Sequence, residues 1–396
     1  MPSSIRKALN ELPDTLDDTY ERILQNIPKQ KWQHAQRLFQ CMVATIRPLR
    51  VEELAEIFAI GFGANVSPNL VEGWRPPNAE EAVLSACSTI ITIIDDRGAK
   101  VVQFSHFSVK EYLTSDRLET SNVMNIRQFY IHLEPAHTTL ARACLAVLLQ
   151  LDGRADEDRH AGFPLALYAA EKWVDHAKFG NVATQVQEGM EELFNPTKPH
   201  LRTWIWIHNV VEGSDSEKID KFPSIELYYA AFCGFSGVAK HLIIAHSLDV
   251  NAKVYEDRTP LHIASNRGHA DVAQVLLDYE ADINAQDTRK WTPLHMATSG
   301  GHVKVVQVLL ERGAALDEQN EYMDTPLSLA SYHGKLEAVR LLLAHGADMK
   351  IRDKRRKTPL QYATSRGHGD IAQLLLDSGA EVEDEETKTV SDIWVE

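Results

Sequence analysis

Apolar residues in the second half of the chain recur at helical spacing, and the same arrangement returns at a fixed interval. Val272 and Leu276 stand four residues apart, as one face of a helix requires, and Val305 and Leu309 repeat that layout 33 residues later. The dipeptide Thr-Pro marks the same interval, at Thr259, Thr292, Thr325 and Thr358. A constant period of this length predicts a stack of similar helical repeats.

Each repeat begins and ends with residues suited to a pair of short helices. Thr259 can cap a helix whose first residue, Pro260, needs no backbone N–H, and Gly268 can adopt the left-handed conformation that ends it. A weaker copy starts at Tyr228 and contains one extra residue in the loop at 246–248. The pattern therefore predicts five repeats, of which the first is divergent.

Glu280 departs from its equivalents in the other repeats. Glycine occupies the same place at Gly313, Gly346 and Gly379, after the second helix of each repeat. If the backbone has a positive φ there, the glutamate is strained by on the order of 1 kcal/mol. We therefore expect Glu280→Gly to raise the melting temperature.

The first half of the chain shows helical periodicity in three segments, followed by a short strand. The first helix follows Pro13 and a capping Asp14, with its apolar face at Leu16, Tyr20, Ile23 and Ile27. The second helix carries Trp32, Ala35, Phe39, Met42, Val43 and Ile46, and the third carries Val51, Leu54, Ile57 and Phe58. A strand at 101–104 then leads into a helix that a capping box of Ser108 and Glu111 opens. This order predicts a winged-helix domain.

Composition and charge argue against several classes of protein. The formal net charge of −15 disfavours a nucleic-acid-binding or membrane-surface protein, both of which need clustered basic residues. The first residues, MPSSIRKALNELPD, lack the apolar core typical of a signal peptide, and no 18 apolar residues run together, so we expect a cytoplasmic protein. Its cysteines lack the spacing of a disulfide framework or zinc site, and we expect them to be small buried side chains: Cys41, Cys87, Cys144 and Cys233.

The repeats decide between two roles for their histidines. His262 and His295 occupy a position that holds Ser328 and Gln361 in the next two repeats. A metal ligand or catalytic base would not survive that exchange, whereas a hydrogen-bonding side chain at a turn would. A second series, His269, His302, Lys335 and His368, leads to the same interpretation. We therefore predict no catalytic residue, no metal site and no cofactor in the repeats.

The period and the motif T-P-L-H-x-A resemble the ankyrin repeat, over residues 222–385. The resemblance implies an α-solenoid with short β-hairpins that binds a protein ligand through its hairpin tips and the exposed ends of the first helices. The positions that match are Tyr255, Glu256, Arg258, Asn266, Arg267, Arg289, Trp291, Ser299, Tyr322, Asp324, Tyr332, His333, Lys354, Arg355, Lys357 and Arg366.

Three aromatic residues in this set, Trp291, Tyr322 and Tyr332, have arginine nearby, which is typical of interface hot spots. The alternative is that they pack against the next hairpin. The basic run at 352–357 could serve nuclear import or bind an acidic partner, so a nuclear location stays open. The alternative, which a folded hairpin favours, is that the run is only a solvated tip.

The first half resembles the winged-helix segment that follows the nucleotide-binding module of fungal NACHT proteins, a segment type also named after GPI inositol-deacylase. The segments LPDTLDDTYERIL and FSHFSVKEYL carry the resemblance, and TLARACLAVLL and PLALYAAEKWVDHA resemble the helical connector of these proteins. The implied domains are a winged helix at 8–120, a connector at 121–221, the ankyrin repeats and an acidic tail at 386–396. By this resemblance His106 contacts the phosphate of bound ADP when a NACHT module is present. The alternative is a buried histidine bonded to the backbone.

The chain carries no recognisable catalytic motif. It has no G-x-x-x-x-G-K-[ST] loop for phosphates, so we expect no ATP hydrolysis by this polypeptide, and the closest approach to G-x-S-x-G is the short GFSG at 234–237. We therefore predict an all-α, non-enzymatic interaction protein, the ligand-recognition half of an NLR-like (STAND) receptor. The alternative is the C-terminal fragment of a NACHT signalling NTPase whose P-loop lies upstream. DNA binding by the winged helix is a third, weaker alternative, given the acidic balance.

Overall fold

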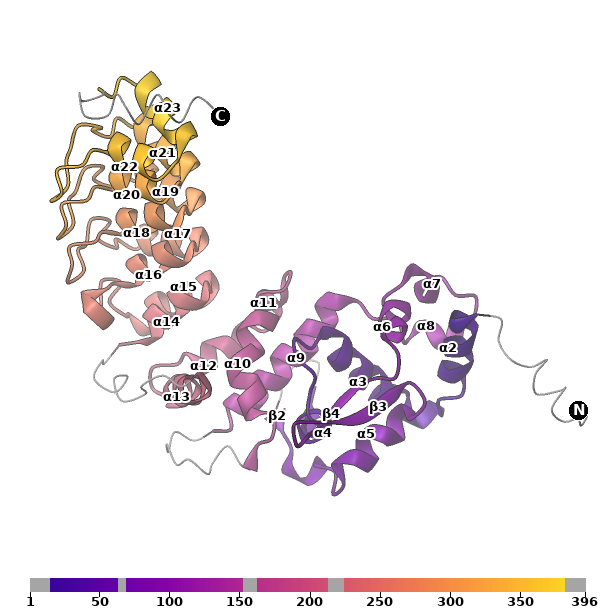
Figure 1. The fold of residues 1–396 in the computed structure, drawn as a ribbon. Helices are drawn as coiled ribbons and strands as arrows, with labels where there is room; N and C mark the ends of the chain where they lie inside the picture. Colours follow the sequence, from indigo (N-terminus) through magenta and orange to yellow (C-terminus); the bar gives the residue numbers. More distant parts are fainter. Residues whose placement is uncertain (1–14, 63–68, 152–161, 213–223, 382–396) are drawn as a thin grey trace, which may run out of the picture. The chain divides into compact units, whose positions relative to one another are not determined.

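The computed structural model describes residues 15–62, 69–151, 162–212 and 224–381, and the chain divides into two units, residues 1–217 and 218–396. Both units are mainly helical, with small antiparallel strand pairs in the first (Figure 1). The all-α prediction is therefore confirmed. The expected tail at 386–396 and the start of the expected winged helix lie outside the described residues, and the domain boundaries given above stay predictions.

The core of the first unit consists of three helices and a β-hairpin. Helices α3 (Trp32–Ala44), α4 (Val51–Phe58) and α5 (Ala79–Cys87) pack against one another and against strands β3 (Ile91–Asp96) and β4 (Ala99–Phe104). Phe39, Leu54 and Ile57 are fully buried there, as their periodicity predicted. The sequence pattern did not predict α5, β3 or the small pair β1 (Ile60–Gly61) and β2 (Asn69–Leu70).

Two predicted helix starts were wrong. Helix α2 (Leu16–Gln25) is capped by Thr15, whose hydroxyl accepts from the Asp18 N–H at 3.1 Å, and Leu16 is 57% exposed because the buried face is formed further along the helix. Helix α6 (Phe107–Leu113) is capped by His106. Ser108 therefore lies within the first turn and does not open a capping box.

The predicted connector helices pack directly on the winged-helix core. Helix α9 (Leu133–Leu148) lies against both α3 and α10 (Ala166–Ala177). Trp173, Phe194 and Trp204 form a buried aromatic cluster beside α10. The shorter helices of this unit are η1 (Lys29–Lys31), η2 (Glu72–Trp74), α7 (Asp116–Glu119), α8 (Met124–Arg127), α11 (Val182–Gln185) and α12 (Gln187–Leu193), followed by α13 (His200–Glu212).

Buried polar groups join the winged-helix core to the connector. Glu53 accepts from both terminal nitrogens of the Arg47 guanidinium at 2.8 Å, and Arg47 also lies 4.8 Å from the ring of Tyr168 in α10. The Tyr168 hydroxyl lies 2.8 Å from Nε2 of His176, whose Nδ1 is 2.8 Å from Nδ1 of His137. Two imidazole nitrogens this close share one proton, so a second proton on the pair is disfavoured. Burial is the main cause that lowers the pKa of His176 to about 3, and His137 adds to the effect.

The second unit consists of five consecutive helix pairs within residues 224–381, stacked side by side (Figure 1). Thr292 and Pro293 show the basis of the repeat, with the threonine at the cap and the proline at the first helical position. The pairs are α14 (Glu226–Cys233) with α15 (Ser236–His246), α16 (Pro260–Arg267) with α17 (Ala270–Asp278), α18 (Pro293–Gly300) with α19 (Val303–Glu311), α20 (Pro326–Tyr332) with α21 (Leu336–Ala344), and α22 (Pro359–Ser365) with α23 (Gly369–Asp377).

The connections between the pairs are tight turns. The expected short β-hairpins are present only as turns, because residues 224–381 contain no strand. Two backbone hydrogen bonds close each turn, such as those from Asp287 N to Trp291 O at 3.0 Å and from Lys290 N to Asp287 O at 2.9 Å. The extra residue of the first repeat lengthens the end of α15, where Ser247 has a φ of 51°. Glu280 has a φ of 65°, the strained conformation expected for it.

Candidate functional site

We call the connections between the repeats fingers, and three of them are built on one buried carboxamide or carboxylate. Oδ1 of Asp287 accepts from the backbone N–H groups of Arg289 and Trp291, at 2.8 and 2.9 Å. Asn320 and Asp353 make the corresponding pairs of bonds in the next two fingers. Because these bonds satisfy the turn internally, the tip tolerates a positive φ without glycine, at Lys290, Met323 and Arg356.

Successive fingers are linked to one another by backbone hydrogen bonds. Thr288 N donates to Glu256 O, and Glu321 N donates to Arg289 O, both at 2.9 Å. Lys354 N donates to Tyr322 O at 3.0 Å. The fingers therefore form one continuous ledge from 255 to 357, and a side chain on one finger is held at a fixed distance from those on the next.

The first histidine series holds this ledge to the helices. Nδ1 of His262 accepts from Thr259 N at 3.2 Å, which leaves Nε2–H to donate to the carbonyl of Trp291 in the following finger at 2.9 Å. His295 does the same for Thr292 and for Asp324 O. Burial lowers the pKa of both imidazoles, that of His295 to about 4, so both are neutral struts with fixed tautomers.

Ser328 and Gln361 perform the first half of that task with other atoms. Ser328 Oγ accepts from Thr325 N at 2.9 Å, and Gln361 Oε1 accepts from Thr358 N at 3.0 Å. The exchange of histidine for serine and glutamine thus preserves one hydrogen bond at the start of each helix, as a structural role predicts.

The second series covers the helix-ending glycines of the preceding repeats. Nε2 of His302 lies 2.9 Å from Asn266 O, and a Cβ on Gly268 would come within 2.6 Å of the His302 ring. The aliphatic chain of Lys335 lies in the same way over Gly301. These glycines therefore meet two demands, a positive φ and contact with the next repeat.

All sixteen predicted recognition residues are at least partly exposed, and seven of them line one cavity of about 290 Å³ between the third and fourth fingers and the adjoining first helices. The seven are Trp291, Tyr322, Asp324, Tyr332, His333, Lys354 and Arg355. Leu329, Asp353 and Tyr362 complete the lining. The other predicted residues lie outside this cavity: Tyr255, Glu256, Arg258, Asn266, Arg267, Arg289, Ser299, Lys357 and Arg366.

The three aromatic residues of the cavity differ in their surroundings. Tyr322 is 49% exposed, whereas Trp291 and Tyr332 are half-buried. Arg366 lies 3.9 Å over the Tyr332 ring, which also packs edge-on against Tyr362. Tyr332 and Trp291 therefore pack within the array, as the alternative predicted, and also line the cavity. Their role as interface hot spots stays a prediction.

The acidic side chains of the cavity are held by the same framework. Oδ2 of Asp353 accepts a hydrogen bond from the Tyr362 hydroxyl, while its Oδ1 accepts the backbone hydrogen bonds of the turn. Burial raises the pKa of Asp324, with the nearby Asp353 adding to the effect. Lys354 and Arg355 stand exposed at the rim, so the cavity has an aromatic floor and a basic edge.

The first fingers have a different character. Arg258 contacts Glu256 at 2.7 Å and the buried Asp287 at 3.3 Å, and Arg289 lies between Glu256 and Glu321 at 3.7 and 4.0 Å. Charges of both signs compensate one another here, whereas the basic edge of the cavity forms no ion pair within residues 224–381.

Asp287, Asn320, Asp353 and Tyr362 were missed from the sequence. The first three lie 33 residues apart, at the same period as Thr-Pro, and that spacing was the available signal. Tyr362 gave none, because the equivalent positions hold Ile263, Met296 and Leu329 and predict only a packed side chain.

His106 is bonded to the backbone, as the alternative predicted, but it is exposed and not buried. Its Nδ1 caps helix α6, 2.6 Å from the Ser108 hydroxyl and 3.3 Å from the Ser108 N–H, and that hydroxyl also contacts the Tyr20 hydroxyl at 2.7 Å. The ring stacks near the exposed Phe107. The capping role fixes the imidazole at the surface and directs Nδ1, rather than Nε2, toward the helix.

Within the parts of the chain that are described, no three His, Cys, Asp or Glu side chains gather as a metal site would require. No helix among them is long and apolar enough to cross a membrane. All four cysteines are buried, and burial raises the pKa of Cys41 to about 12, as expected of small structural side chains.

Comparison with known proteins agrees with this geometry. Residues 227–320 and 313–386 match the model for ankyrin repeats. The second unit is an ankyrin-repeat array. Residues 20–125 match the winged helix domain of GPI inositol-deacylase, which covers α3 to α5 and the β3–β4 hairpin.

One curated relative is similar over a large part of the chain. The chain is 34% identical over 293 residues to "Azaphilone pigments biosynthesis cluster protein L" of Monascus ruber, an alignment that covers 68% of this chain. The chain spans about 60% of the length of that relative.

Proposed function

We propose that this protein is a non-enzymatic interaction protein whose ankyrin fingers bind a protein ligand, with the cavity between the third and fourth fingers as the centre of the contact. The cavity supports this best, because it gathers Trp291, Tyr322 and Tyr332 beside Lys354 and Arg355 on one rigid ledge. Half-buried aromatic rings next to basic side chains are the composition of interface hot spots. The basic edge favours a ligand segment with acidic side chains.

In finer terms, the array is the recognition half of an NLR-like receptor of the STAND class, and the winged helix relays the binding event. Direct packing of α9 on α3 supports a relay, since a change in the connector reaches the winged-helix core through one helix–helix interface. We place the protein in the cytoplasm, with the nucleus as the other possible compartment. No nucleic acid, membrane, metal or cofactor is required for this function.

Capture of ligands by the full chain tests the proposal. Trp291→Ala and Lys354→Glu should each weaken a captured ligand's affinity by tenfold or more, since both lie in the centre of the contact. Trp74→Ala, which removes a tryptophan outside the array, serves as the matched control and should leave the affinity of that protein ligand unchanged. Equal affinity for the wild type and for both cavity variants would refute the assignment.

The second candidate is the C-terminal part of a NACHT signalling NTPase. The exposed His106 favours it, because an imidazole held at the surface through Nδ1 can offer Nε2–H to a phosphate on a neighbouring module. An in-frame P-loop in the transcript upstream of Met1 would support this candidate, and a stop codon there would support the free-standing interaction protein.

A further inference from the structure

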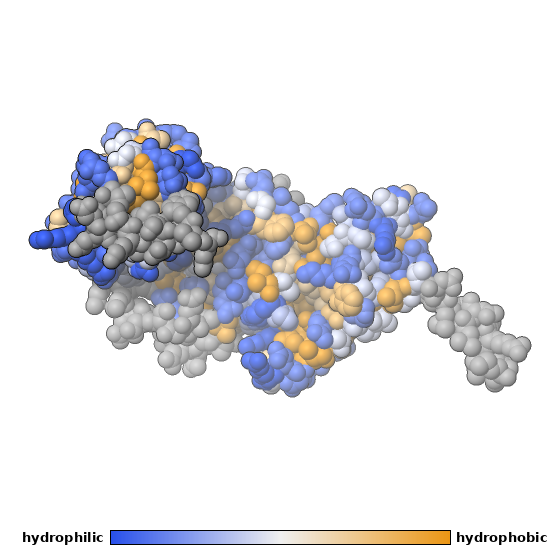
Figure 2. Space-filling view, turned by 45° about the horizontal axis from the view of Figure 1, so that its top comes forward, coloured by the Kyte–Doolittle hydropathy of each residue, from blue (hydrophilic) through white to orange (hydrophobic). Residues whose placement is uncertain are grey.

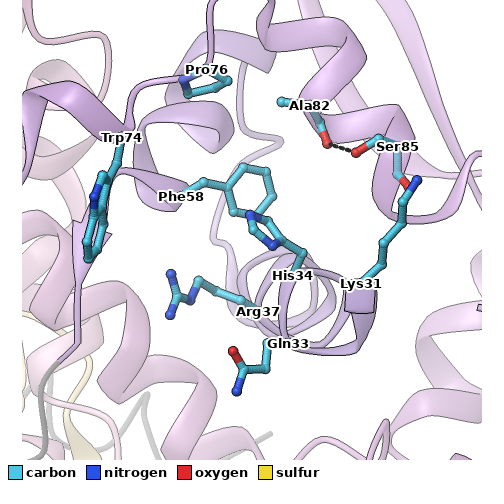
Figure 3. Close-up of a pocket in the computed structure, with 9 residues that line it drawn as sticks. All are labelled: Lys31, Gln33, His34, Arg37, Phe58, Trp74, Pro76, Ala82 and Ser85. Atoms are coloured by element: carbon cyan, nitrogen blue, oxygen red, sulfur yellow. Dashed lines mark hydrogen bonds between the residues drawn. The ribbon is translucent and has the colours of Figure 1, made fainter. Parts of the chain in front are cut away.

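A second cavity, unlike the ankyrin surface in its chemistry, lies in the first unit. It has a volume of about 590 Å³ and opens between α3, α4, η2 and α5 (Figure 3). Its lining consists of Lys31, Gln33, His34, Arg37, Phe58, Trp74, Pro76, Ala82 and Ser85. Volumes of this size are typical of sites for compact ligands.

The charge of this cavity has one sign. Lys31, at the end of η1, and Arg37 in α3 are its two cations, and the lining includes no acidic residue (Figure 3). Burial and the nearby Arg37 lower the pKa of His34, so this ring adds no fixed positive charge. The chain as a whole carries a net charge of −15, so the positive charge that lines this opening is opposite in sign to that of the whole chain.

Arg37 has only weak partners. Its Nη1 lies 3.5 Å from the carbonyl oxygen of Ile60, and its guanidinium carbon lies 4.6 Å over the Phe62 ring. No carboxylate of the described residues forms an ion pair with it, and burial lowers its pKa. A half-buried cation without a counterion gains free energy when an anion arrives.

Two aromatic rings complete the site. Phe58 is buried beneath His34, with ring centroids 4.9 Å apart, whereas Trp74 is 60% exposed and stands across the opening from Lys31 and Ser85 (Figure 3). Lys31 is held in place by a 2.9 Å hydrogen bond to the carbonyl of Ser85. An exposed indole on the same side of the opening as the Arg37 guanidinium offers a flat apolar surface near positive charge (Figure 3).

Hydropathy over the molecular surface does not by itself mark this cavity. In the face drawn in Figure 2, hydrophobic residues form separate patches among hydrophilic ones. Isolated patches on a protein surface are ordinary, so the distinguishing feature of this cavity is the combination of aromatic and cationic side chains around one volume.

We propose that this cavity binds a small aromatic anion, whose carboxylate or phosphate contacts Arg37 while its ring lies against Trp74. The occupant is a small molecule, because the cavity lies among three helices and its positive side chains do not extend into a track along the surface, as a nucleic acid would require. This site is independent of the ankyrin fingers.

Phenyl phosphate, phenylacetate and the neutral benzyl alcohol are suitable probes for the full chain, with affinities measured by calorimetry or saturation-transfer NMR. All three carry one aromatic ring, so the difference among them isolates the charge. We expect at least one anion to bind tenfold or more tightly than the alcohol, and the preferred anion tells whether the natural group is a carboxylate or a phosphate.

Variants locate the binding. Arg37→Gln should lower the anion affinity about tenfold, whereas Arg117→Gln, which makes the same charge change at an exposed position of the same unit, should leave it unchanged. Trp74→Ala removes an exposed ring without disturbing the core and should weaken binding severalfold while circular dichroism stays unchanged.

Three results would each overturn the proposal: equal affinities for alcohol and anions, no anion binding at millimolar concentration, or equal behaviour of Arg37→Gln and Arg117→Gln. Trp291→Ala should not affect these probes, so failure here is distinct from failure of the ankyrin assignment.

Discussion

The two units satisfy their buried polar groups in different ways. In the ankyrin array the partners lie within one repeat or the next, as between His262 and Trp291, 29 residues apart. In the first unit they lie far apart in sequence, as between Thr45 and Tyr168, 123 residues apart, and between Glu56 and Leu165, 109 residues apart. The array therefore shows its polar framework in the period of its sequence, whereas the framework of the first unit exists only once the chain has folded.

The largest test of this contrast concerns Glu53. This carboxylate is 1% exposed, accepts two N–H groups of Arg47 and also accepts from the Arg50 backbone N–H at 2.8 Å. Glu53→Ala leaves those donors without their anion, and we expect the free energy of unfolding of the first unit to fall by about 2–3 kcal/mol, discounted for the partial exposure of Arg47. Chemical denaturation, monitored by hydrogen exchange in α4, measures this free energy.

Glu171→Ala is the matched control, because Glu171 contacts the same arginine at 3.5 Å from a more exposed position. We expect a loss below about 1 kcal/mol there. Equal losses for the two variants would show that the network is not held together at Glu53.

The corresponding test in the array uses Asp287. Asp287→Ala removes the acceptor for Arg289 N, Trp291 N and the Arg258 guanidinium, so we expect a loss of about 2 kcal/mol together with a disordered finger. Asp287→Asn keeps Oδ1, as Asn320 does naturally in the next finger, and should cost less than half as much. Hydrogen exchange at Trp291 N distinguishes the two, and identical behaviour of both variants would contradict the shared turn design.

The pH dependence of the array provides a third test. Since burial lowers the pKa of His295 to about 4 in the folded state, the unfolded chain binds its proton first, near pH 6.5, and stability falls as the pH drops from there toward 4. Between pH 7 and pH 5 we expect the free energy of unfolding of the wild type to fall by on the order of 1–2 kcal/mol more than that of His295→Gln, which introduces the side chain found at Gln361. Thermal melts at the two pH values measure this, and parallel pH profiles for wild type and variant would rule out the strut.

The smallest expected effect is at Glu280. Its φ of 65° lies in the left-handed region that Gly313, Gly346 and Gly379 adopt in the other repeats, so Glu280→Gly should stabilise the array by about 1 kcal/mol. Glu280→Ala keeps a Cβ and should give no such gain. A fall in melting temperature for the glycine variant would show that the glutamate side chain contributes a contact worth more than the strain.

These contrasts also explain how much could be predicted. The helix pairs, their caps and their turn glycines followed from Thr259, Pro260 and Gly268 because each acts on its immediate neighbours. The sequence predicted that Trp291, Tyr322 and Lys354 share one surface. It did not predict that they surround one cavity, because the conformation of each finger depends on Asp287 and its equivalents.

The first unit was less predictable for a physical reason. Helix α5 and strand β3 carry a weak periodicity, and their burial depends on contacts with α3, α4 and β4. The caps at Thr15 and His106 were missed because Asp14 and Ser108 lie one and two residues away and are better cap residues on propensity alone. The cavity around Arg37 left no trace in the sequence, since basic residues on one face of a helix ordinarily indicate solvated surface.

The side chains that cover the turn glycines give the array a direction. The last four repeats each supply a cover for the turn of the repeat before them, namely His269, His302, Lys335 and His368, whereas nothing in the described residues covers Gly367 in the last repeat. An exchange or duplication of repeats keeps these contacts as long as the glycine turn of each repeat meets a long polar side chain from the next repeat. Recombination at the 33-residue period meets that condition automatically, so the array can lengthen or reshuffle its fingers by whole repeats without rebuilding an interface.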